Sequence, residues 1–239
     1  FRTFPGRPAR GRPADNKEER TMKDIDLVLF DLDGTITDPA EGIINSIARA
    51  LFAMNRTMIS EEICRRFIGP ALMDSFTRYC NMTPDEARQA IAYFREYYGE
   101  HGMFECYVFD GIEPLLQRLK AAGKRLAVAT AKAEPFAVKL LRHYGLDTYF
   151  DCIAAAALDN TRNDKAAIIA YALSSLGVTD HSRAVMIGDR EFDITGAHEA
   201  GMPAIGVLYG YGTREELSRA GAEYLAETPE QAGDLILAD

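Results

Sequence analysis

The chain has no long apolar run, no clustered cysteines and no excess of basic residues. A membrane-spanning helix needs roughly 20 apolar residues, and since no run approaches that length we expect no membrane segment. A zinc site needs clustered Cys and His ligands, and no CxxC pair is present among the scattered Cys64, Cys80, Cys106 and Cys152. The formal net charge of −9 disfavours nucleic acid as a partner.

The segment 1–21 also lacks apolar periodicity and is rich in Arg, Pro and Gly. It has no apolar stretch after its basic start, which a signal peptide would need. A transit peptide is a second possibility, although the segment is poor in Ser and contains acids. We expect a disordered tail, or upstream sequence translated ahead of a start at Met22, and a cytoplasmic protein with reduced, partly buried thiols.

What is present is an ordinary globular composition. The 239 residues are 47% hydrophobic and 26% charged, which suits one large domain or two modest ones. Four short apolar runs read as buried strands, at 25–30, 125–130, 184–188 and 204–207. Helical patterns between them stop at glycines, so the sequence predicts an α/β fold with a parallel sheet.

One stretch, from 39 to about 105, contains helical patterns and no convincing strand. Residues 41–54 are amphipathic. Thr83, Pro84 and Glu86 form a good helix start, because Thr caps the helix, Pro suits its first position and Glu its third. This block predicts a separate helical cap over the α/β core.

The segment Asp31-Leu32-Asp33-Gly34-Thr35 directly follows the first strand. Ligands of open α/β sheets bind at the carboxyl ends of strands. Residues i and i+2 of an extended chain point the same way, so Asp31 and Asp33 present two carboxylates to one site. Gly34 permits a tight turn, and the amides that follow can face an anion. A simple Asp-Gly turn is the alternative.

Later strand ends carry groups that suit the same site. The hydroxyl of Thr130 and the amide of Ala131 can bind a phosphate oxygen, although Thr at a strand end is usually structural. Lys165 opens a helix, where a solvated charge is the common alternative. Asp189 and Asp193 offer the carboxylates that Mg²⁺ prefers, and a polar turn with Asp193 as helix N-cap is the other reading.

Together these residues resemble the haloacid dehalogenase superfamily. The DLDGT segment at 31–35 matches its first motif, Thr130 the second, Lys165 the third and the GDREFD segment at 188–193 the fourth. The resemblance runs from Met22 to the C-terminus. It implies a Rossmann-like α/β core, 22–37 and 107–239, with an inserted small α-helical cap, 38–106.

The resemblance also implies roles for these residues. Asp31 would be the nucleophile that forms an aspartyl-phosphate, and Asp33 would protonate the leaving oxygen and then activate water. Gly34, Thr35, Thr130, Ala131 and Lys165 would bind the phosphate. Asp31, the backbone carbonyl of Asp33, and Asp189 would hold Mg²⁺, with Asp193 as a further or outer ligand.

Finer features are similar to the phosphoglycolate phosphatase-like branch. They are the segment 67–70 (FIGP) and the segment 206–212 (GVLYGYG). One departure is Lys165-Ala166, where many relatives have Lys-Pro; the charge is preserved. The expected activity is Mg²⁺-dependent hydrolysis of a small phosphomonoester, with phosphoglycolate and nucleoside 5′-monophosphates as leading substrates.

Alternatives remain open at this stage. A phosphomutase on the same scaffold also uses Asp33, and a silent binding module would have lost the nucleophile or a metal acid. A dehalogenase is disfavoured because its chemistry leaves Asp33, Asp189 and Asp193 without a purpose.

Four cap arginines could meet an anionic substrate, although a solvated charge is the better reading of each: Arg65, Arg66, Arg78 and Arg88. Tyr97 and Tyr98 read as cap core, and the oligomeric state cannot be read.

Overall fold

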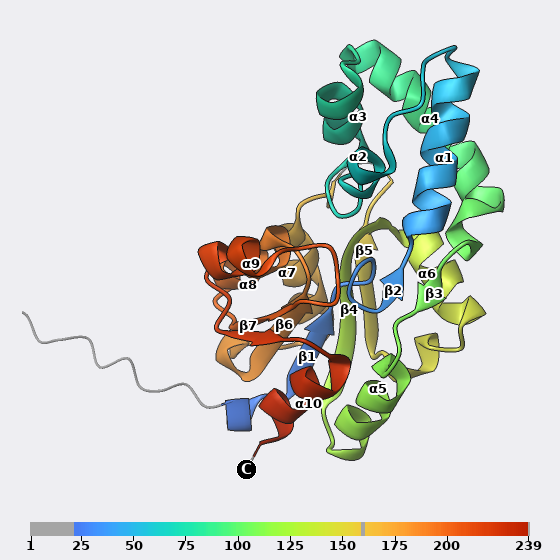
Figure 1. Ribbon diagram of the computed structural model, residues 1–239. Coiled ribbons are helices and arrows are strands. Elements are labelled where there is room, and N and C mark those ends of the chain that lie inside the picture. The colour runs from blue at the N-terminus through green and yellow to red at the C-terminus, as the bar shows by residue number, and fades with distance from the viewer. Residues whose placement is uncertain (1–21, 159–160, 239) are drawn as a thin grey trace, which may run out of the picture.

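A six-stranded parallel sheet lies at the centre of the protein in the computed structural model, which describes residues 22–158 and 161–238 (Figure 1). Its strands, in spatial order, are β5 (Cys152–Ala156), β4 (Arg125–Ala133), β1 (Leu27–Phe30), β6 (Ala184–Gly188), β7 (Ala204–Val207) and β8 (Tyr224–Ala226). All five pairings are parallel. The central β1 pairs with β4 on one side and β6 on the other, so the segments that follow these three strands become neighbours.

Helices cover both faces of this sheet. One face carries α5 (Ile112–Ala121), α6 (Glu134–His143) and α10 (Pro229–Leu237), and the other carries α7 (Lys165–Ser175), α8 (Glu191–Glu199) and α9 (Arg214–Ala220). Side chains alternate along a strand, so Val28 and Phe30 of β1 join one hydrophobic core, while Leu27 and Leu29 join the other. The sheet is buried on both faces, which explains the continuous apolar runs.

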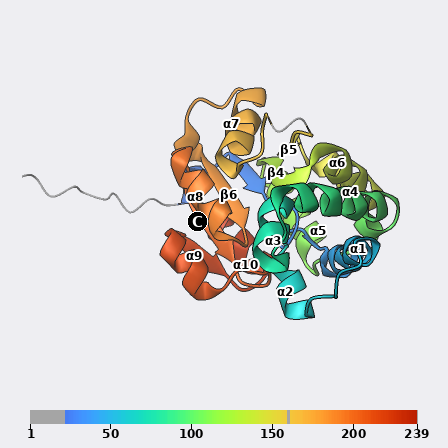
Figure 2. The same cartoon turned by 90° about the horizontal axis from the view of Figure 1, so that it is seen from above.

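Four helices stand apart from the sheet, beyond the carboxyl ends of its strands (Figure 1). They are α1 (Ala40–Ala53), α2 (Glu61–Arg65), α3 (Leu72–Cys80) and α4 (Pro84–Glu100). The view from above shows α3 and α4 lying over the sheet (Figure 2). The helix start predicted at Thr83 is present: its side chain accepts from the N–H of Glu86, and Glu86 accepts from the N–H of Thr83.

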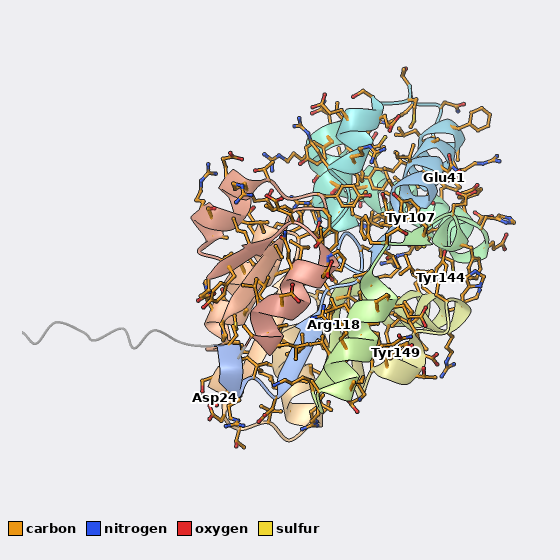
Figure 3. All side chains as sticks on the ribbon, turned by 60° about the horizontal axis from the view of Figure 1, so that its bottom comes forward. Asp24, Glu41, Tyr107, Arg118, Tyr144 and Tyr149 are labelled. Carbon is orange, nitrogen blue, oxygen red and sulfur yellow. The ribbon has the colours of Figure 1, made fainter. Side chains whose placement is uncertain are left out.

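The chain enters and leaves this helical unit through a short antiparallel ribbon of β2 (Thr37–Asp38) and β3 (Tyr107–Val108). The hydroxyl of Tyr107, a residue labelled in Figure 3, donates to the carboxylate of Asp38 at 2.8 Å across this ribbon. Short 3₁₀ turns complete the described elements: η1 (Met22–Asp24), η2 (Gly102–Phe104), η3 (Asp147–Tyr149) and η4 (His181–Arg183).

The predicted α/β class and all four predicted strands are confirmed, with the second strand extended to Ala133. Two strands of the sheet escaped prediction, as did the two-residue strands β2 and β3 of the ribbon. β5 is alanine-rich, a composition with weak strand preference, and β8 has only three residues. The predicted tail at 1–21 lies outside the described residues. Across 22–158 and 161–238, the helices are too short or too polar to cross a membrane.

Candidate active site

The carboxyl end of β1 places Asp31 between the ends of two neighbouring strands. The backbone N–H of Asp31 donates to the carbonyl of Ile187 in β6 at 2.9 Å. On the other side, Thr130 lies near the end of β4, where it is buried. The strand order therefore brings together the segments that begin at Asp31, Thr130 and Asp189, which are far apart in the sequence.

Three carboxylates converge at this point. Asp31, Asp189 and Asp193 each offer one oxygen, and these oxygens lie within 4.8 Å of one another. All three side chains are buried, Asp189 and Asp193 completely. Among the residues that the structure describes, Oδ1 of Asp31 and Oδ1 of Asp193 are reached only by the ammonium of Lys165. Three buried carboxylates this close together repel one another, and a hard cation that prefers carboxylate oxygens relieves the repulsion, so these residues fit Mg²⁺.

Lys165, the first residue of α7, supplies a positive charge beside this cluster. Its ammonium lies 2.9 Å from Oδ1 of Asp31 and 2.7 Å from Oδ1 of Asp193, and it donates to the carbonyl of Ala129 at 2.9 Å. The Asp164 side chain caps α7 by accepting from the N–H of Ala167. Asp164 thereby fixes the start of the helix, although Lys165 is followed by alanine instead of proline.

Burial and mutual repulsion perturb the ionisation of this cluster. Burial, with the nearby charges of Asp193 and Asp31, raises the pKa of Asp189 well above its usual range. Burial also raises the pKa of Asp193, although Lys165 acts in the opposite direction. For Lys165, burial lowers the pKa, but the charges of Asp193 and Asp31 outweigh it and raise the pKa overall. Lys165 therefore remains a cation that partly neutralises the carboxylates.

Two hydrogen bonds hold the carboxylate of Asp189, and a glycine lies against it. The Thr35 hydroxyl donates to its Oδ1 at 3.2 Å, and the backbone N–H of Tyr211 donates to its Oδ2 at 2.8 Å. A Cβ on Gly34 would lie 2.3 Å from Oδ2 of Asp189, and Gly34 has φ +90°. Only glycine suits this turn, because of both its backbone conformation and the lack of space.

The backbone amides that follow Asp33 donate hydrogen bonds within their own loop. The N–H of Gly34 donates to the carbonyl of Thr37, and the N–H of Thr35 donates to the carbonyl of Leu32. This differs from the expectation that these amides face an anion, because the loop turns back on itself. Thr35 instead contributes its hydroxyl to Asp189.

Asp33 lies beside a residue that the sequence analysis missed. Its carboxylate pairs with Lys132, whose ammonium lies 2.8 Å from Oδ1 and 2.7 Å from Oδ2. Asp33 is not part of the three-carboxylate cluster of described side chains. A lone lysine after a strand usually reads as a solvated charge, so Lys132 was not singled out. Its closeness to Thr130 was the only signal in the sequence.

Thr130 is oriented by the same segment. Its Oγ1 accepts from the backbone N–H of Lys132 at 3.2 Å. This contact uses the hydroxyl as an acceptor and leaves its proton available for donation to a ligand oxygen. The neighbouring Ala131 is exposed.

A cavity of about 500 Å³ lies between the helical unit and the sheet. It is lined by Asp38, Glu62, Arg65, Arg66, Phe109, Arg190, Tyr209, Gly210, Tyr211 and Glu216. Arg65 pairs with Glu61 at 2.8 Å and Arg66 with Glu62 at 2.7 Å, each one helical turn away. Arg78 and Arg88, the other two arginines singled out in the sequence, contact the Tyr79 ring and Asp85. These local contacts agree with the expectation that each of the four arginines is a solvated surface charge.

Comparisons with known proteins place the chain in a family. Residues 28–207 match the family model of haloacid dehalogenase-like hydrolases. The chain is 41% identical to a 5′-nucleotidase of Pseudomonas aeruginosa over 193 residues, which cover 80% of this chain and 86% of that protein. It is 39% identical to the tyrosine-protein kinase PtkA of Mycobacterium tuberculosis over 193 residues, covering 81% of this chain. The match spans only 65% of the length of PtkA.

Solved structures agree. The crystal structure of a predicted phosphatase from Clostridium acetobutylicum superposes with a TM-score of 0.85 at 43% identity, covering 89% of this chain and 98% of that one. The family model spans most of the sheet and the whole helical unit. On the motifs, the sheet order and these matches, the chain belongs to the haloacid dehalogenase-like hydrolase family.

Proposed function

We propose that this protein is a Mg²⁺-dependent phosphatase that hydrolyses a small phosphomonoester through an aspartyl-phosphate on Asp31. The observation that carries the proposal is the pairing of Asp31 with Lys165 at 2.9 Å, beside two further buried carboxylates. A nucleophilic carboxylate, a fixed cation and a set of metal ligands are the groups that phosphoryl transfer needs at one point.

In the first step, a carboxylate oxygen of Asp31 attacks the phosphorus atom and the bond to the ester oxygen breaks. Asp33 gives a proton to the leaving oxygen. In the second step, Asp33 accepts a proton from water as the water attacks the phosphorus. The bond to Asp31 then breaks, releasing inorganic phosphate and restoring the free carboxylate.

Asp31, Asp189 and the backbone carbonyl of Asp33 would hold Mg²⁺, with Asp193 as a further or outer ligand. The metal, when bound, offsets the repulsion between the carboxylate nucleophile and the phosphate dianion. Lys165 and the hydroxyl of Thr130 would bind phosphoryl oxygens and stabilise their charge as the phosphoryl group moves. In this proposal Lys165 shares its charge between Asp31 and the substrate.

We propose that the helical unit, residues 38–106, is the cap that closes over the substrate, and that 22–37 with 107–239 form the core. The cavity between the cap and the core supports this division, because closure of the cap over it would shield a bound leaving group from bulk water. The lining of this cavity mixes charged and aromatic residues, which favours a polar leaving group. The name of one relative, a 5′-nucleotidase, and the resemblance to the phosphoglycolate phosphatase-like branch make nucleoside 5′-monophosphates and phosphoglycolate the first substrates to test.

The test is phosphate release with Mg²⁺ from a panel of phosphoglycolate, nucleoside monophosphates and sugar phosphates. We expect release from at least one class, and loss of release in Asp31→Asn with an unchanged circular dichroism spectrum. Activity retained in folded Asp31→Asn would overturn the role of Asp31. A folded wild-type protein that releases nothing from any ester would overturn the phosphatase proposal.

The same panel of phosphate esters distinguishes the phosphatase from two alternative functions. A phosphomutase would move phosphate between positions of a sugar phosphate without releasing it, which phosphorus NMR detects. A silent binding module would bind phosphate esters without changing them. The retention of Asp31, Asp189 and Asp193 in one buried cluster favours catalysis over silent binding.

A further inference from the structure

Lys132 joins the proposed proton donor to the cap. Besides its two contacts with the carboxylate of Asp33, its ammonium donates a hydrogen bond to the hydroxyl of Tyr98. Tyr98 belongs to α4 of the cap, while Lys132 and Asp33 belong to the core. The three side chains therefore form a continuous polar link from the cap to Asp33.

Tyr98 is fixed where it makes this contact. Its ring stacks on Phe94 of the same helix at 5.4 Å and meets the edge of Phe136 from the core helix α6 at 5.5 Å. The side chain is 4% exposed, and burial raises the pKa of its hydroxyl to about 12. Tyr98 thus remains protonated at neutral pH and packs against both parts of the molecule.

The backbone of β4 directs Lys132 into the site. The pairing of β4 with β5 shifts register between Thr130 and Ala133, where Ala155 and Ala156 are adjacent on the other strand. Such irregularities re-aim side chains near active sites. The hydroxyl of Thr130 then holds the N–H of Lys132 at 3.2 Å, so the residue proposed to bind phosphate also fixes the position of Lys132.

The burial of this ion pair distinguishes it from an ordinary surface pair. The side chains of Lys132 and Asp33 are 5% and 15% exposed, whereas those of Lys120 and Asp151 are 36% and 35% exposed. A buried ion pair contributes little net stability, because desolvation offsets the attraction. A contribution to stability alone is therefore a weak explanation for placing Lys132 beside Asp33.

We propose that Lys132 is a positioning residue that holds the Asp33 carboxyl group in place for proton transfer when Tyr98 of the cap docks on it. Closure of the cap is thereby coupled to the geometry of the proton donor, and an open cap leaves Lys132 without its second partner. The inference rests on the proposed function for its catalytic consequence. The link between the cap and the core can be measured without activity.

The catalytic consequence depends on the leaving group. An alkyl phosphate releases a strongly basic alkoxide and needs the proton from Asp33, whereas p-nitrophenyl phosphate releases a weakly basic phenolate and needs it little. We expect Lys132→Met to lower kcat on the best alkyl ester by about tenfold or more, within the range of general acid catalysis. On p-nitrophenyl phosphate we expect a change below about threefold.

Two comparisons show whether Lys132 acts through Asp33. In an Asp33→Asn background, Lys132→Met should cause no further loss on the alkyl ester, because the group that it positions has already been removed. Lys120→Met removes a lysine from an exposed ion pair with Asp151 and is the matched control. Equal losses on both esters, or additive losses with Asp33→Asn, would overturn the positioning role.

The link itself is tested by thermal unfolding of Lys132→Met, Tyr98→Phe and the double variant. We expect the fall in Tm of the double variant to be smaller than the sum of the two single falls by about 2 °C or more. Additive falls would show that the two residues are not coupled and would overturn the inference. Coupling in a protein that hydrolyses no ester would instead refute the proposed phosphatase function and leave the link standing.

Discussion

The guanidinium of Arg190 donates a hydrogen bond of 2.6 Å to the backbone carbonyl of Ile68, joining the residue after Asp189 to the helical unit. The same side chain pairs with Glu216 at 2.8 Å, and its backbone N–H donates to the carboxylate of Asp193 at 3.0 Å. A Cβ on Gly69 would lie 3.0 Å from the guanidinium. Arg190 thus contacts both a candidate metal ligand and the helical unit.

Replacing Arg190 by Met should weaken substrate binding more than turnover, because it removes a charged hydrogen bond that holds the cap. We expect KM to rise by about tenfold, the equivalent of one such bond, with kcat changed less. Steady-state kinetics on the best ester measures this. Arg183→Met, which breaks an exposed pair with Asp26, is the control, and a fall confined to kcat would contradict the prediction.

Replacing Lys165 by Met should destabilise the metal-free protein by about 3–5 kcal/mol, because it leaves buried carboxylates without their cation. Turnover should fall by about 10²–10³-fold, since a charge that stabilises the transferring phosphoryl group is lost. Urea unfolding and phosphate release measure the two effects. A variant as stable as the wild type would show that Lys165 does not neutralise the cluster.

Addition of Mg²⁺ should raise the melting temperature, because the metal binds carboxylates that repel one another in the metal-free protein. At saturation we expect a rise of about 5 °C or more, and EDTA should reverse it and stop turnover. Asp189→Asn should abolish the rise. Asp234→Asn, which alters an exposed pair with Arg118, should preserve it. Equal shifts in both variants would place the metal elsewhere.

Gly34→Ala should lower stability and activity together. The new Cβ would overlap the Asp189 carboxylate and would also require a left-handed backbone at φ +90°, so we expect a loss of about 2–4 kcal/mol. Gly123→Ala separates the two causes, because Gly123 has φ +76° but open space around it. That variant should lose only about 1–2 kcal/mol and keep full activity. Equal losses in stability would show that crowding at Asp189 contributes nothing.

The cysteines should react slowly with iodoacetamide in the folded protein. All four are free thiols, and burial raises the pKa of each, that of Cys64 to about 11. A raised pKa keeps a thiol protonated at pH 8, and the reactive thiolate forms only as the pH approaches the pKa of that thiol. Mass spectrometry should find few alkylated thiols before unfolding and four afterwards. Rapid labelling of Cys64 in the native state would contradict the prediction.

Much of the fold could be predicted because strands and helices leave local patterns. The runs that became β1, β4, β6 and β7 are continuous and apolar, as strands buried on both faces must be. Strand β5 could not be recognised in the same way, because its alanines fit a helix as well as a strand. It is a strand because β4 offers it a parallel edge.

The sequence offered Asp193 as a possible helix N-cap, and the structure places it within the first turn of that helix instead. Arg190 caps α8, and Asp193 is the third residue of that helix. From this position its carboxylate both accepts from the N–H of Arg190 and faces Lys165. The sequence showed an acid near the helix start, but only the turn of the chain decided where that acid points.

The sequence by itself determined the α/β class, the helical insertion and the acids at the ends of strands, because these depend on composition and on spacing within a few residues. Tertiary structure alone decided that Lys132 holds Asp33, 99 positions away, and touches Tyr98, 34 positions away. It also decided that Lys165 lies between Asp31 and Asp193. Such pairs depend on the order of strands and on the docking of the cap, and contacts between distant segments leave no periodic signal in the chain.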